Sequence, residues 1–389
     1  MSREFRAVFT EIGPELFSAY KLEACRMSDN YSRRTFLSRS GCAAALATGA
    51  MQGPALAGGQ DGKKIRVAQI GVGHAHAAGK MQAYRQSSEY EVVGVCEPDE
   101  ALRERVRSSG VYKGLRWVSR KELLNLPGLQ AVAVETRVRD SLEHAEACVD
   151  AGLHIHLDKP AGSSLPRFRK ILQTASAKGK VVQMGYMYRY NPGIVFLRKA
   201  LAEGWLGEVF EVHTVMSKVV GAGSRKGLAE YPGGIMFELG CHIVDLVVGI
   251  LGAPQKVTAF NRHSSSIEDN LVDNMLAVLE YPTALATVKS SAQEVEGFAR
   301  RHLVVCGSEG TLQVQPLDSP SVRLALSKPR GKFKRGYQEV RLPRYVRYID
   351  DAADFARIIR GEKKSDFSIE HDEAVQRVVL EACRLPLKP

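Results

Sequence analysis

A lysine that follows a predicted strand could take part in proton transfer. Lys159 lies in Asp158-Lys159-Pro160, directly after the apolar stretch His154–Leu157. Burial at such a position could lower the pKa of the ammonium group, which could then hydrogen-bond a substrate hydroxyl. We therefore predict that Lys159 is a catalytic residue.

A histidine on a predicted helix offers a second group for acid–base chemistry. Gly233-Gly234 precedes Glu238, His242 and Asp245, whose spacing places all three on one face of an α-helix. A histidine with a carboxylate one turn earlier can relay a proton. The alternative interpretation is a helix on which Glu238 and His242 merely pair with each other.

A glycine turn between a strand and a helix predicts a binding site for phosphate groups. Ile65–Ile70 is a short, β-branched, apolar stretch, followed by Gly71 and Gly73 and then by the Ala-rich segment His74–Lys80. The glycines permit a tight turn and a close backbone approach, and the helix N-terminus favours a pyrophosphate. An ordinary α/β turn is the alternative. The third glycine of the dinucleotide fingerprint is replaced by His76.

A carboxylate after the second predicted strand supports dinucleotide binding. Tyr90–Cys96 ends in Glu97, which could accept hydrogen bonds from an adenosine ribose. A carboxylate there would repel the 2′-phosphate of NADP, so we predict NAD and regard NADP as the alternative. Arg103 and Arg105 are expected to lie too far along the next helix to reverse this preference.

Strands and helices alternate from Ile65 to about Met184, which predicts a doubly wound parallel sheet of the Rossmann type. We expect a short strand at Leu115–Val118 within this pattern. The ligand should lie beyond the carboxyl ends of the strands, where Thr136 and Asp158 fall.

After Asn191-Pro192 the pattern changes to alternating strands separated by turns, which predicts an α+β domain with a large, mostly antiparallel, open-faced sheet. We place the boundaries as follows: an N-terminal extension and signal at 1–57, a nucleotide-binding Rossmann domain at 58–185, a substrate and oligomerisation domain at 186–349, and C-terminal helices at 350–389 that pack back on the Rossmann domain. The open sheet face is expected to form a homo-oligomer.

Together, the glycine turn, Glu97, Asp158-Lys159-Pro160 and the segment Glu238–Asp245 resemble the glucose–fructose oxidoreductase / inositol dehydrogenase (Gfo/Idh/MocA) family. The resemblance covers roughly Lys64 to Leu385. It implies that Lys159 orients a sugar or polyol hydroxyl, that His242 takes its proton, and that Glu238 assists His242. It also implies that the segment Arg189-Tyr190-x-Pro192 lines the cleft, so we assign Arg189, Tyr190 and His242 to the substrate.

The resemblance and the glycine turn together define the predicted cofactor site. It comprises Gly71, Val72, Gly73, His74, His76, Glu97, Thr136, Asp158 and Lys159. The chain departs from the family pattern in having Asp158 and Glu238 where Glu and Asp are usual. Arg137 replaces the usual proline after Thr136 and could contact a cofactor phosphate, an acidic substrate or solvent.

The N-terminal segment predicts export. Ser32-Arg33-Arg34-Thr35-Phe36-Leu37 is a twin-arginine pattern, followed by the apolar run Cys42–Ala50 and a small-residue cleavage site ending at Ala57. A disordered basic tail is the alternative. We expect a periplasmic or secreted protein without a membrane anchor, because no apolar run is long enough to span a bilayer.

Two further patterns favour ordinary interpretations. The pairs His74/His76 and His154/His156 have no carboxylate or cysteine partner at ligand spacing in the sequence, so we expect no metal. The basic segment 328–347 contributes strongly to the formal net charge of +11. We expect it to be a solvated loop, with attraction to an anionic saccharide as the alternative, and we expect no nucleic-acid partner for an exported protein.

These observations predict an exported oxidoreductase that moves a hydride between a sugar or polyol carbon and NAD. One alternative is an NAD-dependent glycoside hydrolase or lyase that oxidises a sugar transiently, since Lys159 and His242 would start both reactions. A second alternative is a non-catalytic saccharide-binding protein.

Overall fold

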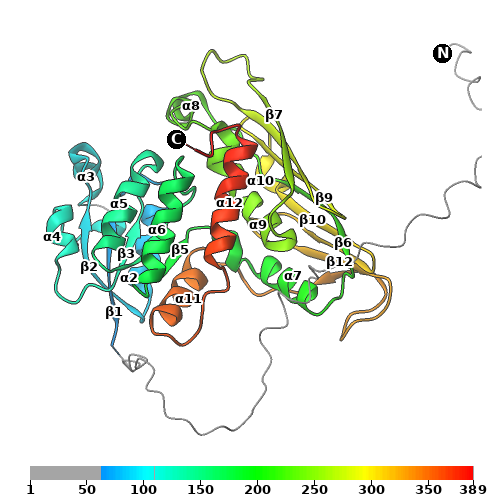
Figure 1. Cartoon of the computed structure of the whole chain (residues 1–389), viewed down its shortest axis with the longest axis horizontal. Helices are drawn as coiled ribbons and strands as arrows, with labels where there is room; N and C mark the ends of the chain where they lie inside the picture. The colour runs from blue at the N-terminus through cyan, green and yellow to red at the C-terminus, as the bar shows by residue number, and fades with distance from the viewer. Residues whose placement is uncertain (1–62, 109, 389) are drawn as a thin grey trace, which may run out of the picture. The chain divides into compact units, whose positions relative to one another are not determined.

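The computed structural model describes residues 63–108 and 110–388, so the predicted signal lies outside the described residues. A five-stranded parallel sheet comes first, in the order β2-β1-β3-β4-β5 (Figure 1). Its strands are β1 (Ile65–Ile70), β2 (Tyr90–Cys96), β3 (Ala131–Val134), β4 (His154–Leu157) and β5 (Val182–Met184). The predicted Rossmann-type parallel sheet is confirmed.

Both faces of this sheet are covered by helices, because successive strand residues point to opposite sides. Ile65, Val67 and Ala133 face one side and pack with α2 (Ala77–Gln86) and α11 (Ile349–Ile359). The opposite side packs against α4 (Arg120–Leu124), α5 (Val138–Asp150) and α6 (Leu165–Ala177). This layering leaves the carboxyl ends of the strands as the place where polar loops meet.

The predicted strand at Leu115–Val118 is wrong. Only one isolated parallel bridge forms there, between Val95 and Trp117. The segment ends at Ser119, whose side chain accepts a hydrogen bond from the Glu122 amide in a capping box that starts α4. A helix cap directly after Val118 leaves too little extended chain for a ladder.

The second sheet has eight strands in the order β13-β12-β11-β10-β6-β9-β8-β7. All its neighbouring strands are antiparallel except β6 and β9, which run parallel. The strands are β6 (Val209–Val215), β7 (Lys256–Arg262), β8 (Asn274–Glu280), β9 (Leu285–Ser291), β10 (His302–Gly307), β11 (Gly310–Val314), β12 (Val322–Leu326) and β13 (Gly336–Val340). The predicted mostly antiparallel sheet is therefore confirmed.

One face of this sheet is buried and the other is open. Met275, Ala277 and Val288 lie on the buried face, whereas Phe260 and Leu285 on the opposite face are 47% and 56% exposed. Homo-oligomerisation through the open face stays a prediction. Strand β13 at the sheet edge lies inside the basic segment 328–347, so the expectation of a loop throughout that segment is wrong.

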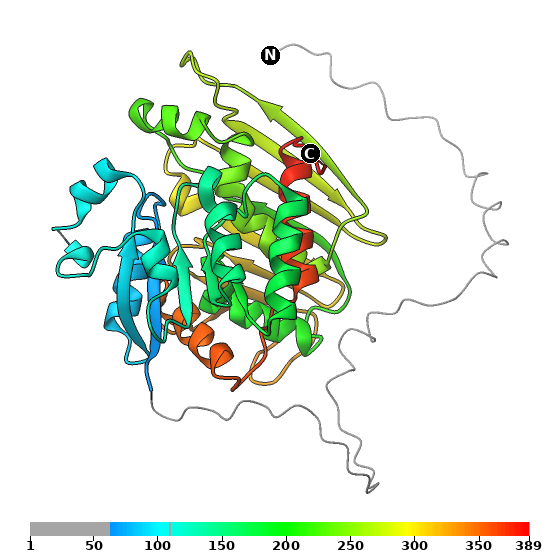
Figure 2. The ribbon, with the colours of Figure 1, turned by 60° about the vertical axis from the view of Figure 1, so that its left-hand side comes forward.

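Helices from the second half of the chain connect the large sheet to the Rossmann layer. The last helix, α12 (Ile369–Ala382, red in Figure 2), contacts α6, α9 (Cys241–Leu251) and β7. Further helices are α3 (Glu100–Val106), α7 (Pro192–Ala202), α8 (Ala222–Ala229) and α10 (Gly297–Arg300), with 3₁₀ turns η1 (Gly110–Tyr112) and η2 (Met187–Tyr190). Among the described helices, none combines the length and apolar character needed to cross a bilayer.

The predicted helix that carries His242 is not uniformly α-helical. Met236–Gly240 (η3) forms a π-helical turn, and α9 begins only at Cys241. A π-turn closes i→i+5 hydrogen bonds, so residues four apart no longer lie directly above one another. The expectation that Glu238, His242 and Asp245 share one α-helical face is therefore wrong.

Candidate functional site

Two adjoining cavities lie beyond the carboxyl ends of the Rossmann strands. The first, of about 870 Å³, is lined by Glu97, Thr136 and the start of α3. The second, of about 1090 Å³, is lined by His74, Glu238 and residues of α8. Gly73 and Arg137 line both cavities. Their size and position suit a dinucleotide that extends from one to the other, with room for a second small molecule.

The glycine turn is shaped for close approach of a phosphate group. Gly71 has φ +91°, and a Cβ atom there would lie 2.5 Å from the Thr136 amide nitrogen. The Gly71 amide donates to the Cys96 carbonyl oxygen at 2.7 Å, which holds the turn against β2. The fit to a dinucleotide pyrophosphate therefore rests on a backbone conformation that only glycine adopts easily.

Glu97 lies where the sequence predicts it. Its Oε2 accepts a hydrogen bond from the Val72 amide at 2.7 Å, and its Oε1 accepts one from the Asp99 amide at 2.9 Å. These bonds fix a buried carboxylate against the first cavity with acceptor capacity left for ribose hydroxyls. Arg103 also lines this cavity, nearer than expected, and its guanidinium is paired with Glu100 at 3.0 Å. That Arg103 does not reverse the preference for NAD stays a prediction.

Arg137 marks the junction of the two cavities. Its guanidinium pairs with Asp99 at 2.9 Å, and both side chains are substantially exposed (41% and 36%). Surface pairs of this kind contribute little to stability, so the guanidinium can exchange this partner for an anionic ligand at small cost. The neighbouring Thr136 has a buried Oγ1 without a hydrogen-bond partner, at the same cavity wall.

Lys159 crosses from the Rossmann layer to the second half of the chain. Its Nζ donates to the Glu238 carbonyl oxygen at 2.6 Å and lies 3.7 Å from Glu238 Oε1. Burial, the largest single influence, would lower the pKa of Lys159, but the charges of Glu238, Cys241 and Asp158 together outweigh it and the pKa is raised. The predicted lowering of this pKa is therefore wrong. Lys159 is a buried, charged hydrogen-bond donor rather than a base.

Glu238 lies between two lysines instead of being held by His242. Its Oε2 is 3.3 Å from the Nζ of Lys218, and its other oxygen faces Lys159. Burial would raise the pKa of Glu238, but the two ammonium groups lower it, so the side chain is a carboxylate at the wall of the second cavity. Sequence reasoning missed Lys218, a single charged residue after β6 with no motif around it.

His242 is buried beside this group and is neutral. Burial holds its pKa well below the usual value, and the charge of Lys159 lowers the pKa further. Its Nδ1 has no hydrogen-bond partner, and its ring lies 5.9 Å from that of His76 and 5.5 Å from that of Tyr188. A neutral imidazole next to a charged donor can accept a proton.

Asp158 joins the glycine turn to the end of β4. Its Oδ2 lies 3.0 Å from Nδ1 of His74 and 3.1 Å from Nδ1 of His76, and its Oδ1 accepts from the Lys159 amide at 2.7 Å. Burial would raise the pKa of Asp158, but the two histidines hold it well below the usual value. The two histidines therefore do have a carboxylate partner, which sequence spacing could not reveal because Asp158 lies 82 residues beyond His76.

Glu135 is a buried acid that sequence reasoning missed. It is fully buried, and neither of its carboxylate oxygens has a hydrogen-bond partner. Burial raises its pKa well above the usual value, and the negative charge of Asp158 raises it further. Its position directly after the buried strand β3 was the available signal, since ligand-binding side chains gather at carboxyl strand ends.

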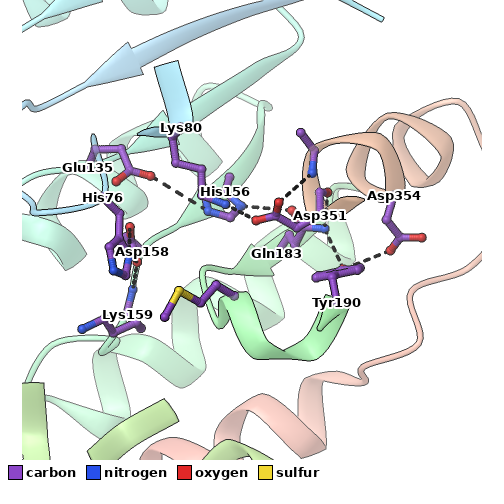
Figure 3. Close-up of polar contacts among 12 residues, drawn as sticks. His76, Lys80, Glu135, His156, Asp158, Lys159, Gln183, Tyr190, Asp351 and Asp354 are labelled. Carbon is purple, nitrogen blue, oxygen red and sulfur yellow. Dashed lines mark hydrogen bonds and ion pairs between the residues drawn. The ribbon is translucent and has the colours of Figure 1, made fainter. Parts of the chain in front are cut away.

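Behind the site, a row of polar side chains runs away from the cleft (Figure 3). His156 contacts Gln183 at 3.0 Å, Gln183 donates to the Tyr190 hydroxyl at 3.0 Å, and that hydroxyl donates to Asp354 at 3.0 Å. Lys80 pairs with Asp351 beside this row. Tyr190, assigned to the substrate from the sequence, is placed in this row and not among the residues that line either cavity.

Arg189 is placed in a second buried group, which we call the Arg189 cluster: Arg189, Asp245, Asp372 and His371. The guanidinium lies 2.6 Å from Asp245 and 2.6 Å from Asp372. His371 Nε2 lies 3.1 Å from Asp245. Arg189, expected at the substrate, is thus held by two carboxylates, and Asp245 belongs to this cluster instead of a relay with His242. Lys159 and His242, like Arg189, do not line the two cavities, but they adjoin Glu238 and His76 at the site.

Two family models match the chain. Residues 65–186 match "Oxidoreductase family, NAD-binding Rossmann fold", and residues 194–313 match "GFO/IDH/MocA C-terminal domain". Together they cover the Rossmann layer and most of the large sheet, the two parts that contribute to the cleft.

Relatives and solved structures agree with these matches. The chain is 25% identical to the uncharacterized oxidoreductase YhhX of Escherichia coli over 259 residues, 66% of this chain and 73% of that one. It is 28% identical to the D-glucoside 3-dehydrogenase of E. coli over 209 residues, 51% of this chain and only 57% of that enzyme. The fold of UDP-N-acetylglucosamine 3-dehydrogenase GnnA from Acidithiobacillus ferrooxidans matches with a TM-score of 0.70 at 18% identity, covering 84% and 98% of the two chains.

Proposed function

The chain belongs to the Gfo/Idh/MocA oxidoreductase family and has an NAD(P)-binding Rossmann fold; from this premise we propose that it oxidises a hydroxyl-bearing carbon of a sugar or polyol with NAD. The observation that carries the proposal is the meeting of a charged Lys159 and a neutral His242 beside the glycine turn. One is a fixed donor and the other a vacant proton acceptor, which are the two groups that oxidation of an alcohol requires.

The roles of the chain's residues follow from their protonation states. Lys159 would donate a hydrogen bond to the substrate hydroxyl oxygen and stabilise the negative charge that develops on it. His242 would accept the hydroxyl proton. A nicotinamide, when bound, supplies the acceptor for the hydride that leaves the same carbon. Glu238 would keep Lys159 charged and in place through the contacts that now hold its Nζ.

The choice of NAD rests on Glu97. The carboxylate is fixed by two backbone amides and lines the first cavity, where a ribose would present its hydroxyls. A 2′-phosphate would meet this carboxylate at close range and be repelled. Arg103 on the same wall is the feature that would favour NADP, although Glu100 already pairs with it.

The proposed substrate class follows from the polar side chains in the wall of the second cavity and from the relatives. Lys218, Glu238 and Tyr231 offer hydrogen-bond donors and acceptors in its wall, as a polyhydroxylated ligand needs. The E. coli relative named D-glucoside 3-dehydrogenase acts on a glucoside by its name. Export by the twin-arginine route is part of the proposal and rests on Arg33-Arg34 and the following apolar run.

The proposal is tested on the purified full chain in two steps. Mass spectrometry identifies a nucleotide that co-purifies or binds, and single-turnover nicotinamide absorbance is then followed with a panel of sugars and polyols. Lys159→Met should abolish most of the absorbance change, whereas the matched control Lys170→Met, an exposed lysine on α6 paired with Glu146, should not. Binding of no dinucleotide, or equal activity of both variants, would contradict the proposal.

Export is tested separately with a double substitution. Arg33→Lys together with Arg34→Lys should leave precursor in the cytoplasm, because the twin-arginine pattern depends on both guanidinium groups. Cell fractionation measures the distribution. Normal export of the double variant would contradict the twin-arginine proposal but would not affect the dehydrogenase proposal.

A further inference from the structure

Three potential ligand atoms converge at the edge of the second cavity. One ring nitrogen from each of His74 and His76 and a carboxylate oxygen of Asp158 all lie within 4.8 Å of one another. The two histidines come from the glycine turn and the start of α2, and Asp158 comes from the end of β4. Figure 3 shows His76 and Asp158 facing each other across this gap.

Two contacts of His74 compete for the same ring nitrogen. Its Nδ1 lies 3.2 Å from the backbone N–H of His76, a contact that only an unprotonated nitrogen can accept. The same Nδ1 lies 3.0 Å from Oδ2 of Asp158. A proton on Nδ1 would serve Asp158 and give up the contact with the His76 amide, whereas a cation between Nδ1 and Oδ2 would be bound by both atoms.

The two histidine–aspartate spacings suit a metal ion, and a small movement of one imidazole would bring all three ligand atoms to bonding distance. Bonds of about 2.1 Å to nitrogen and oxygen at right angles place neighbouring ligand atoms about 3.0 Å apart. The two histidine–aspartate contacts are 3.0 and 3.1 Å. Two histidines and one carboxylate, with the remaining side open to ligands, form a donor set that binds Fe²⁺, Mn²⁺, Co²⁺ or Zn²⁺.

Glu135 supplies an independent observation. Its side chain is 0% exposed, both of its oxygens lack a hydrogen-bond partner, and Oε2 lies 3.9 Å from Nδ1 of His74. The nearby cation, Lys80, is already paired with Asp351. The other neighbours of Glu135 are His156, 3.9 Å from Oε1, and the Asp158 carboxylate, so ionising Glu135 is costly; a cation at the histidines would stabilise the charged form directly or through a coordinated water.

We propose that His74, His76 and Asp158 form a three-ligand site for a divalent transition metal, with Glu135 as an outer partner. This reverses the expectation drawn from sequence spacing, which could not bring Asp158 to the two histidines. Of the three residues, His74 lines the second cavity, and this side of the site is the one we expect to be open to a ligand. If the proposed function holds, the metal would bind a substrate hydroxyl oxygen there and favour its deprotonation; metal binding itself does not depend on that function.

The test measures metal binding directly and needs no activity. The tag-free full chain is stripped with a chelator and titrated with Co²⁺, whose visible absorption reports nitrogen and oxygen ligation, and bound metal is counted by mass spectrometry. We expect one ion per chain. Glu135→Gln should weaken binding about 10–100-fold, as loss of an outer partner does, and His76→Ala should weaken it at least as much.

Controls separate this site from surface histidines and from misfolding. His213→Ala removes an exposed histidine on the large sheet and should leave the Co²⁺ affinity unchanged. Circular dichroism shows whether each variant is folded. Less than one ion per chain in the wild type, or equal affinity for the wild type and a folded His76→Ala variant, would overturn the proposal. Metal binding without dehydrogenase activity would instead count against the proposed function alone.

Discussion

Two buried groups of charged and polar side chains differ in how many of their polar atoms have hydrogen-bond or ion-pair partners. In the Arg189 cluster, no buried polar side-chain atom lacks a partner within the described part of the chain. Around the cleft, Thr136 in the wall of the first cavity and Glu135, His156 and His242 behind the walls all carry buried polar atoms without hydrogen-bond partners. Burying such atoms costs free energy, so a fold keeps them where a ligand or a reaction uses them. We therefore expect the first group to stabilise the helices and the second to surround the proposed site.

Replacing one histidine from each group gives the largest expected contrast in rate. His242→Asn should lower the rate of nicotinamide reduction roughly 10²–10⁴-fold, because the proton acceptor is lost. Nucleotide affinity should change little, since His242 comes from the second half of the chain. His371→Asn, in the Arg189 cluster, should leave the rate near that of wild type. Stopped-flow absorbance and calorimetric nucleotide titration measure both, and full turnover by His242→Asn would transfer the base assignment to another residue.

Breaking the Arg189 cluster should instead affect stability. Arg189→Met leaves Asp245 and Asp372 buried without their cation, which should lower the free energy of unfolding by about 3–5 kcal/mol. The matched control Arg169→Met removes an exposed pair with Glu373 and should cost less than about 1 kcal/mol. Urea unfolding measures both. Similar costs for the two variants would show that the cluster does not stabilise the helices.

His154 lies outside both groups and should make the stability of the fold depend on pH. Burial lowers the pKa of His154 to about 4 from its usual 6.5. The unfolded chain therefore binds a proton below pH 6.5 that the folded chain binds only below about 4, so stability falls as the pH drops between these values, by up to about 3 kcal/mol. His154→Asn should flatten this part of the unfolding curve. An unchanged pH dependence would show that the loss comes from other groups.

The smallest expected effect concerns the adenosine end of the cleft. Glu97→Ser removes the carboxylate fixed by the Val72 and Asp99 amides. The binding free energy of NAD should weaken by roughly 1–3 kcal/mol, and the difference in affinity between NAD and NADP should become smaller. Isothermal titration with both nucleotides measures the preference. A wild-type chain that already prefers NADP would show that Arg103, and not Glu97, dominates this wall.

The sequence predicted the elements better than the partners of their charged residues. Local patterns placed the strand His154–Leu157 and the residues Lys159 and His242. This was possible because the alternation of strands and helices, and the glycine turns, depend on residues that are neighbours in the sequence. The π-turn that separates Glu238 from His242 has no comparable local signal. Arg189 pairs with Asp372 across 183 residues, and that partner is chosen by tertiary packing alone.

The central claim is that the cleft transfers a hydride from a sugar or polyol carbon to a bound nicotinamide. The most direct measurement uses a carbon-deuterated form of the substrate that gives the largest absorbance change, with mass spectrometry of the reduced nucleotide after one turnover. The account predicts one deuterium in the nicotinamide ring for wild type, and almost none for His242→Asn within the same time. A reduced nucleotide without deuterium, or a product formed with no reduced nucleotide at any time, would contradict it.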